Sequence, residues 1–499
     1  MKEKMLHLGK NIIAYSSMLL IGVLFIISVF STAYFDPENL GAEHPLYRFD
    51  NPLWFICFAV VLMSIFYFIK KIPVKILFAV LMVYTLGAGV YWVSAGGVCP
   101  DADQMSVSLI ASLTAQNNFL FFEPEKYMQI YPNQLGMVAF LEMIYRIAGG
   151  ENYQIFQYIN AVANCFVIAA LYAIVDILFK KETIKRIFLI LSFGCFHLIL
   201  YSTFVYGVTM GLAFALWSVF LALYFIERKN RVAAIGSCIC MALAILFKNN
   251  YSIFLVALVL LFLYKGIEKK RLEFILWIIL LLGTWKGTEG ALISLYEQRS
   301  GIELTAGMPK VMWVAMGMQE GERAEGWYNA FNYDTFRETG CDAEKSSEIA
   351  KSAIKKSAIA FWEHPGYAAE FYYKKFVSQW NEPTYASIWV NMFHQGEFSV
   401  LIQSFYDGKI NTVAVEYMNL YQSFLFMGAV ILLICNRKKW KEEQLILFLI
   451  ILGGFFFHML WEAKSQYIMP YFILLLPYAA AGADLLYDNA KLYINRKRK

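Results

Sequence analysis

The chain has 499 residues, of which 59% are hydrophobic, 17% aromatic and only 16% charged. Soluble globular proteins contain about 45–50% apolar and roughly 25% charged residues, so the composition excludes a water-soluble enzyme, a disordered chain and a nucleic-acid-binding protein. The net charge of +5 is small for this length. Lys and Arg in loops on one side of a membrane can account for it. We therefore expect an all-α polytopic membrane protein.

Twelve mostly apolar stretches are candidates for membrane-spanning helices, which need about 20 residues because lipid offers the backbone no hydrogen-bond partner, and several of them are at the short end of that range. They are predicted at residues 10–32, 53–70, 73–95, 155–179, 185–204, 208–226, 231–247, 251–265, 272–287, 413–435, 444–460 and 467–487. The first run is too long for the apolar core of a cleaved signal peptide, which favours an uncleaved first span.

The segment 133–150 is a shorter apolar run, which contains Glu142 and Arg146 and ends in two glycines. We interpret it as an outer-face interfacial or re-entrant helix that does not cross the membrane. With twelve crossings and both termini inside, seven basic clusters fall on the cytoplasmic side, as the positive-inside rule predicts. The clusters include Lys2, Lys4, Lys10, Lys70, Lys71, Lys75, Lys180, Lys181, Lys185, Arg186, Arg228, Lys229, Arg231, Lys265, Lys269, Lys270, Arg271, Arg437, Lys438, Lys439, Lys441 and Arg496 to Lys499.

The same topology leaves two long outward segments, and charged residues inside the spans lie only near their ends. We therefore expect any chemistry to take place at the outer membrane face. The predicted division is into N-terminal spans, a first catalytic outer loop, a central bundle, an extracytoplasmic loop domain, and C-terminal spans with a basic tail. The corresponding residues are 1–95, 96–154, 155–287, 288–412 and 413–499. The outward cysteines, Cys99 and Cys341, could form a disulfide or remain free thiols.

Asp101 and Asp103 directly follow a predicted span and precede a predicted helix. Asp103 could cap that helix, because a carboxylate there accepts hydrogen bonds from free backbone N–H groups. It could also be a general base, which must be ionised and within reach of a hydroxyl proton. The two roles are compatible. Tyr127 and Tyr131, further along the same segment, suit either an interfacial belt or stacking on a sugar.

These residues resemble the first outer loop of the GT-C integral-membrane glycosyltransferases. The likeness is to the polyprenyl-phosphate-sugar-dependent branch, which includes protein O-mannosyltransferases and the lipid A aminoarabinose transferase. Within it, the loop is similar to that of Gram-positive proteins that read Pro-x-x-Asp, a helix, and then Tyr-Pro-x-Gln-x-Gly. The matching residues here are Pro100, Asp103, Tyr131, Pro132, Gln134 and Gly136.

Three further stretches resemble later parts of that family, and together they cover most of the chain. Met308–Asn329 resembles the opening of the large outer loop, and His364–Pro383 its later helix and Trp-containing turn. Trp461–Phe472 resembles the motif before the last span, where relatives often carry Arg in place of Gln466.

The resemblance implies a bacterial cytoplasmic-membrane enzyme that moves a hexose-type sugar, with inversion, from a polyprenyl-phosphate donor to an envelope glycan, lipid or protein. Asp103 would be the catalytic base, with Asp101 as the second choice. Cations or dipoles can stabilise the leaving phosphate, and Lys248 and Lys464 are the candidates, although each taken singly is more often an interfacial lysine that reaches toward water. The expected substrate-binding residues are Tyr127, Tyr131, Asn133, Gln134, Lys248, Glu462, Lys464, Gln466 and Tyr467.

One departure from some relatives concerns a metal site. The loop around Tyr206 and Gly207 continues with Val208, where a second acidic residue would be sought. The sequence therefore identifies no cofactor. A divalent cation could bind, but we do not expect the reaction to require one.

Two other functions compete with glycosyl transfer. A transporter or flippase of lipid-linked polysaccharide would need charged residues along a path through the spans, which the sequence largely lacks. A polymerase or ligase of such glycans would be expected to use arginines of the large outer loop. Here Arg299, Arg323 and Arg337 are scattered along it. Lys351, Lys355 and Lys356 form a basic stripe in the same loop, which could bind an anionic acceptor but is more typical of a solvated helix face.

Overall fold

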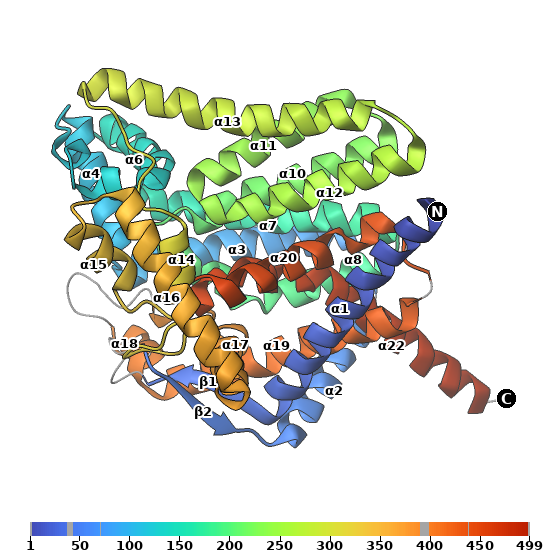
Figure 1. Ribbon diagram of the computed structural model, residues 1–499. Coiled ribbons are helices and arrows are strands. Elements are labelled where there is room, and N and C mark those ends of the chain that lie inside the picture. Colours follow the sequence, from blue (N-terminus) through green and yellow to red (C-terminus); the bar gives the residue numbers. More distant parts are fainter. Residues whose placement is uncertain (1, 37–42, 70, 390–398, 438, 498–499) are drawn as a thin grey trace.

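The computed structural model describes residues 2–36, 43–69, 71–389, 399–437 and 439–497. Lys70, Lys438, Arg498 and Lys499 of the predicted basic clusters lie outside these ranges. Helices dominate the described chain (Figure 1). Strands β1 (Ser31–Phe35) and β2 (Pro45–Phe49) form an antiparallel hairpin in which Ser31 pairs with Phe49.

Ten helical segments in the described ranges are long and apolar enough to cross a membrane. They confirm an all-α polytopic membrane protein. The helices are α1 (Lys2–Phe30), α2 (Pro52–Ile69), α3 (Val74–Gly96), α7 (Tyr153–Phe179), α10 (Val208–Arg228), α12 (Ser252–Lys269), α13 (Glu273–Ser300), α19 (Lys409–Asn436), α20 (Ile446–Leu460) and the consecutive pair α21 (Met469–Ile473) and α22 (Leu475–Lys497).

By length and apolar composition, the described ranges contain ten or eleven of the twelve predicted spans. The span expected at 185–204 is bent by 48° between α8 (Glu182–Phe193) and the segment Phe196–Thr203, which contains α9 (Phe196–Leu200) and the 3-10 turn η4 (Tyr201–Thr203). The helix expected at 231–247 is α11 (Arg231–Phe247), which has 17 residues and is short for a span. Counting the bent pair as one span gives up to 11. The span predicted to end at residue 287 continues in α13 to Ser300.

Shorter elements gather at one end of the long helices (Figure 1). They are α4 (Asp103–Ala115), η2 (Leu120–Phe122), α5 (Tyr127–Ile130), η3 (Pro132–Gln134), α6 (Leu135–Ala148), η5 (Asn249–Tyr251), α14 (Val311–Met316), α15 (Phe331–Glu338), α16 (Ala343–Glu363), α17 (Pro365–Trp380), α18 (Val400–Asp407) and η8 (Ser465–Tyr467). The turn η7 (Glu442–Leu445) precedes α20 instead.

Helix α6 lies within the segment 133–150, which was predicted not to cross the membrane. It has 14 residues, about two thirds of the length that a span needs. Its buried Glu142 accepts hydrogen bonds from Arg146 at 2.8 Å, Arg299 at 2.5 Å and the hydroxyl of Tyr296. These contacts fasten α6 to the last turns of α13, which explains why α13 continues beyond its apolar part.

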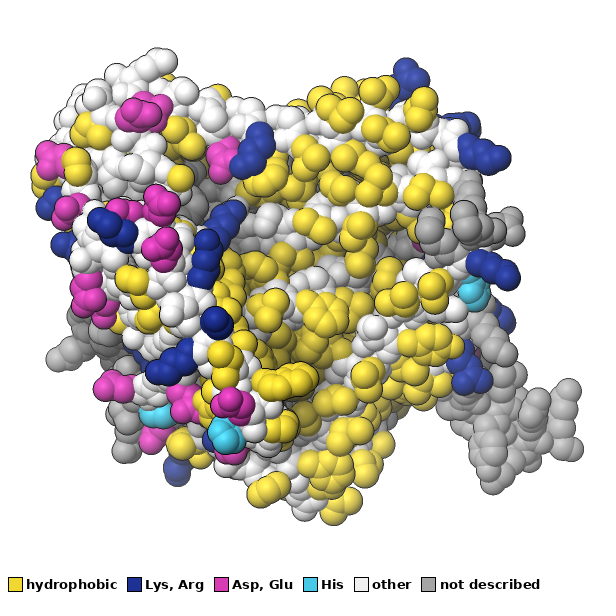
Figure 2. All heavy atoms as spheres, in the orientation of Figure 1, with side chains coloured by type: hydrophobic (Ala, Val, Ile, Leu, Met, Phe, Trp, Pro, Cys, Tyr) yellow, Lys and Arg dark blue, Asp and Glu magenta, His cyan; other side chains and the backbone are white. Residues whose placement is uncertain are grey.

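The two ends of the helical bundle differ in structure: basic residues gather at one end, and the shorter helices at the other. The described residues of the predicted basic clusters lie at the end of the bundle where the chain begins and ends. Ion pairs join three of them to acidic residues there: Lys10–Glu442 at 3.7 Å, Lys180–Glu227 at 2.6 Å and Lys181–Asp484 at 2.7 Å. A band of exposed hydrophobic side chains separates this end from the shorter helices (Figure 2). The distribution is that of a protein whose middle lies in a bilayer.

Candidate active site

Asp103 is the first residue of α4, and its carboxylate is exposed. The N-cap is Ala102, with a φ of 47°, and no side chain caps the helix, so the interpretation of Asp103 as a cap is wrong. Its oxygens accept hydrogen bonds from two tyrosines instead: Oδ1 from the Tyr127 hydroxyl at 3.1 Å and Oδ2 from the Tyr206 hydroxyl at 3.2 Å. Each oxygen keeps lone-pair capacity for a proton from another group.

The contact between Tyr206 and Asp103 could not be predicted from the sequence. It is buried in the turn before α10, and its hydroxyl accepts a hydrogen bond from Gln134 Nε2 while it donates to Asp103. The backbone of the turn is held by Gln104, whose Oε1 accepts from Val205 N at 2.8 Å. Burial, with the charge of Asp103 adding to it, raises the pKa of Tyr206 well above its usual value, so the hydroxyl stays protonated as a donor.

Lys248 lies on the ring of Tyr206. It follows the last residue of α11, and its Nζ is 3.7 Å from the Tyr206 ring centroid and 5.9 Å from that of Tyr467. Burial lowers the pKa of Lys248 to about 8, against the opposing effect of the Asp103 and Glu462 charges. Lys248 is half-buried, and the charges of both carboxylates act on its ammonium.

Two glycines let this cluster form. A Cβ on Gly207 would lie 2.1 Å from the carbonyl oxygen of Phe247, and one on Gly136 would lie 2.1 Å from that of Leu246. The turn that carries Tyr206 and the start of α6 thus pack directly on the last turn of α11, immediately before Lys248. Gly136 belongs to the Tyr-Pro-x-Gln-x-Gly motif, so a packing role accounts for the last position of that motif.

The segment between α20 and α21 supplies the next charges. Glu462 is 8% exposed, and Tyr467 donates a hydrogen bond to its Oε1 at 3.4 Å. Burial raises the pKa of Glu462 to about 7; the charges of Lys464 and Lys248 oppose this rise. Lys464, which was predicted to contact the substrate, donates from its Nζ to Glu43 Oε1 at 2.7 Å.

Glu43 and Lys375 are two further charged residues that the sequence did not single out. Glu43, which precedes β2, also pairs with Arg323 at 2.5 Å. Lys375 is fully buried in α17 and donates hydrogen bonds to the carbonyl oxygens of Trp461, at 2.8 Å, and of Gly317. Burial lowers the pKa of Lys375 to about 7. Lys375 thereby joins the three later stretches on which the resemblance rests, and it holds the turn that carries Glu462.

Aromatic rings form one wall beside Asp103. Tyr127 and Tyr131 are 5.0 Å apart between ring centroids, and Tyr131 meets Trp313 at 6.4 Å. Trp313 in turn stacks on Trp461, with the centroids 5.6 Å apart and the planes 6° from parallel. Such a row of flat faces is suited to contact with a sugar ring.

The other predicted residues lie at the edges of the cluster. Asn133 is exposed in η3, and Gln466 lines a small pocket together with Lys248 and Tyr467. Asp101 lies near Cys99, where its charge adds to burial in raising the pKa of that thiol. Cys99 and Cys341 are both free thiols. No group of three His, Cys, Asp or Glu side chains in the described ranges could hold a metal ion.

No known family profile matches the sequence, and no curated protein matches it significantly. The ground for assigning an activity is therefore the chemistry of the site: an accessible carboxylate held by two hydroxyl donors, a half-buried ammonium on the ring of one of those donors, and an aromatic wall.

Proposed function

We propose that the protein is an inverting glycosyltransferase of the GT-C type. It transfers a hexose-type sugar from a polyprenyl-phosphate donor to an envelope glycan, lipid or protein acceptor. The membrane is the bacterial cytoplasmic membrane, with both termini inside and the Asp103 site outside. The observation that carries the proposal is the position of Tyr206, which donates to the exposed carboxylate of Asp103 while the half-buried ammonium of Lys248 lies on its ring.

In the proposed reaction, the acceptor hydroxyl attacks the anomeric carbon of the sugar. Its proton passes to a free lone pair of Asp103 as the new carbon–oxygen bond forms. The bond from the anomeric carbon to the phosphate oxygen breaks, and its electron pair leaves with the polyprenyl phosphate on the opposite face of the sugar. The Tyr127 and Tyr206 hydroxyls fix the orientation of the carboxylate, which places the base before the substrate arrives.

Lys248 is the proposed contact for the departing phosphate. Coulomb attraction strengthens as the surroundings lose water, so a half-buried ammonium stabilises the developing negative charge better than an exposed lysine would. Lys464 is a weaker candidate than the sequence indicated, because Glu43 already neutralises it. The aromatic row from Tyr127 to Trp461 is the proposed contact for the sugar ring.

The test is transfer from a panel of radiolabelled polyprenyl-phosphate sugars in membranes that contain wild-type protein, Asp103→Asn or Asp101→Asn. We expect Asp103→Asn to lower the transfer rate by about 100-fold or more, the usual contribution of a general base. Asp101→Asn is the matched control, because it removes the same charge two residues away without touching either tyrosine. It should retain the wild-type rate.

Each other outcome has a definite meaning. Full activity in Asp103→Asn would overturn the assignment of the base, and loss of activity in Asp101→Asn alone would move that role to Asp101. Failure of the wild-type protein to consume any donor, with envelope acceptor present, would overturn glycosyl transfer and favour transport of a lipid-linked glycan.

A further inference from the structure

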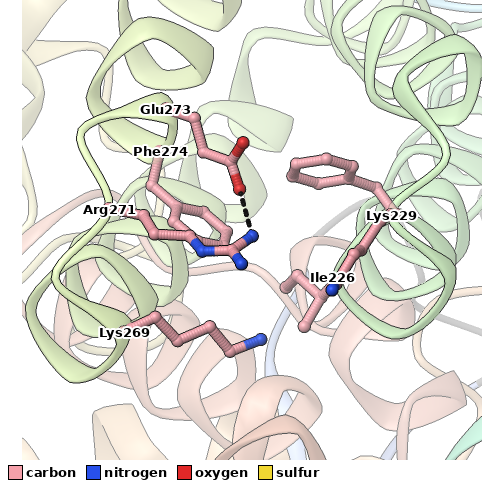
Figure 3. Close-up of a pocket in the computed structure, with 7 residues that line it drawn as sticks. Ile226, Lys229, Lys269, Arg271, Glu273 and Phe274 are labelled. Carbon is pink, nitrogen blue, oxygen red and sulfur yellow. Dashed lines mark hydrogen bonds and ion pairs between the residues drawn. The ribbon is translucent and has the colours of Figure 1, made fainter.

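A second site lies at the opposite end of the bundle from Asp103, between the end of α10 and the turn that joins α12 to α13 (Figures 1 and 3). It is a cavity of about 350 Å³, within the ~300–1,000 Å³ that small-ligand sites occupy. Its buried lining is apolar, with the ring centroids of Phe225 and Phe274 5.9 Å apart and Ile226 beside them.

Three cations surround this apolar floor. The side chains of Lys229, Lys269 and Arg271 line the same cavity, with Glu273 as the one carboxylate among the lining residues (Figure 3). Glu273 pairs with Arg271 at 3.2 Å, whereas neither lysine forms an ion pair within the described ranges. The cavity therefore has an excess of positive charge.

The nearest acidic residues in sequence do not neutralise the two lysines. Glu227 pairs with Lys180 at 2.6 Å, and Glu268 pairs with Lys265 at 3.0 Å. Favourable interaction with helix dipoles explains part of the arrangement, since Lys229 caps the C-terminus of α10 and Lys269 ends α12. It does not explain Arg271, which lies beyond the C-terminus of α12, nor the cavity that the three side chains share.

The surroundings of the cavity identify the class of ligand. Beyond Arg271, the surface continues along α13 with exposed apolar side chains: Leu272 is 77% exposed, Leu276 66% and Ile279 62%. Figure 2 shows such hydrophobic side chains over much of the neighbouring surface. A soluble anion would use only the cations, whereas a phospholipid would use both the cations and the apolar face.

We propose that this cavity binds the phosphate headgroup of an anionic phospholipid, whose acyl chains lie along the exposed face of α13. Lys229 and Lys269 provide point charges for the phosphate, and Arg271 provides directed N–H donors beside it. Basic pockets between membrane helices are known to hold such headgroups. The proposal does not depend on glycosyl transfer, because the site is at the other end of the molecule from Asp103.

The test uses the full-length protein in phosphatidylcholine nanodiscs, with phosphatidylglycerol added as the probe and bound lipid counted by native mass spectrometry. We expect the wild-type protein to retain phosphatidylglycerol in preference to phosphatidylcholine. The double variant Lys229→Gln/Lys269→Gln should bind phosphatidylglycerol about 10-fold more weakly, because each lysine near an anionic headgroup adds to the electrostatic attraction that holds the lipid. Lys355→Gln/Lys356→Gln on α16 is the matched control, because it loses the same charge at the other end and should bind as the wild type does.

Two further arms distinguish the outcomes. Inorganic phosphate or glycerol phosphate that displaces the lipid at equal concentration would show a soluble-anion site and overturn the lipid proposal. Equal retention by the wild type and the Lys229→Gln/Lys269→Gln variant would overturn it as well. Both lysines are exposed, so the double variant should fold. Lys229→Arg/Lys269→Arg, which keeps the charge, should restore binding if charge is the cause and not a change in fold.

Discussion

Tyr206 connects the two charged groups of the candidate active site by two different interactions. Its hydroxyl donates to Asp103, and its ring face lies 3.7 Å from the ammonium of Lys248. A phenylalanine at this position would keep the ring and lose the hydroxyl. The two interactions can therefore be separated by a single substitution.

We expect Tyr206→Phe to lower the transfer rate by roughly 10- to 100-fold. A hydrogen bond to a charged group is worth about 1.5–3 kcal/mol, and each 1.4 kcal/mol corresponds to a factor of about ten. The measurement is the initial rate of sugar transfer in membranes. Tyr172→Phe, on a tyrosine that packs against Phe78 in the spanning region, is the control and should leave the rate unchanged. A wild-type rate in Tyr206→Phe would mean that Tyr127 alone orients the base.

The lowered pKa of Lys248 predicts how kcat/KM changes at alkaline pH. Its pKa is lowered to about 8, so the cation is present below that pH and lost as the pH rises through it. We expect kcat/KM, which reports the free enzyme, to fall above a pH of about 8. Lys248→Arg stays charged throughout this range and should keep its activity to higher pH, whereas Lys248→Gln should be slow at every pH. An identical alkaline fall in wild type and Lys248→Arg would exclude Lys248 as its cause.

The site is assembled by contacts between elements that are far apart in the chain. The turn before α10 and the start of α6 both meet the end of α11, and each does so through a glycine. The turn that carries Glu462 is held by Lys375 of α17. No one of these elements positions the base and the cation by itself.

We expect Gly207→Ala to destabilise the protein by about 1–3 kcal/mol, the usual cost of forcing an extra carbon into packed structure. The new Cβ would lie 2.1 Å from the Phe247 carbonyl oxygen, so the turn must move away from α11. Thermal unfolding in detergent measures the effect, and the transfer rate should fall with it as Tyr206 leaves Lys248. Gly150→Ala is the control, since nothing lies within 4 Å of its Cβ. Equal stability of the two variants would contradict the packing argument.

The whole molecule has a basic end with both termini and an end with the Asp103 cluster, separated by an apolar band. Such a separation predicts that the two ends face opposite sides of the membrane. The positive-inside rule assigns the basic end to the cytoplasm.

This orientation can be tested by labelling with a membrane-impermeant thiol reagent. Lys355→Cys on α16 should react from outside intact cells, and Lys270→Cys only after the cells are opened. The natural exposed cysteines, Cys57 and Cys435, are first replaced by serine. Reaction of both introduced thiols from the same side would contradict the orientation.

Composition and apolar runs were sufficient to predict the class of protein and most of the long helices. The physical reason is that a backbone in lipid must satisfy its own hydrogen bonds, so the sequence of each span must be a continuous apolar stretch. Where that requirement weakens, the structure departs from a simple straight span: α11 has only 17 residues, the α8–α9 segment is bent by 48°, and α13 continues past its apolar part, where Glu142 binds Arg299.

From the sequence, the site could be predicted only as a set of residues that occur in a certain order along the chain, and not as a set of contacts. Asp103, Lys248, Glu462 and Tyr467 were expected to act together, and their contacts and mutual electrostatic effects bring them into one cluster. The contacts around them were not predictable, because Tyr206 meets Asp103, Glu43 meets Lys464 and Lys375 meets Trp461 across more than 80 residues of chain. Hydrophobic pattern is a local property of the chain, whereas the pairing of Lys464 with Glu43 and the burial of Lys248 arise only when distant segments pack.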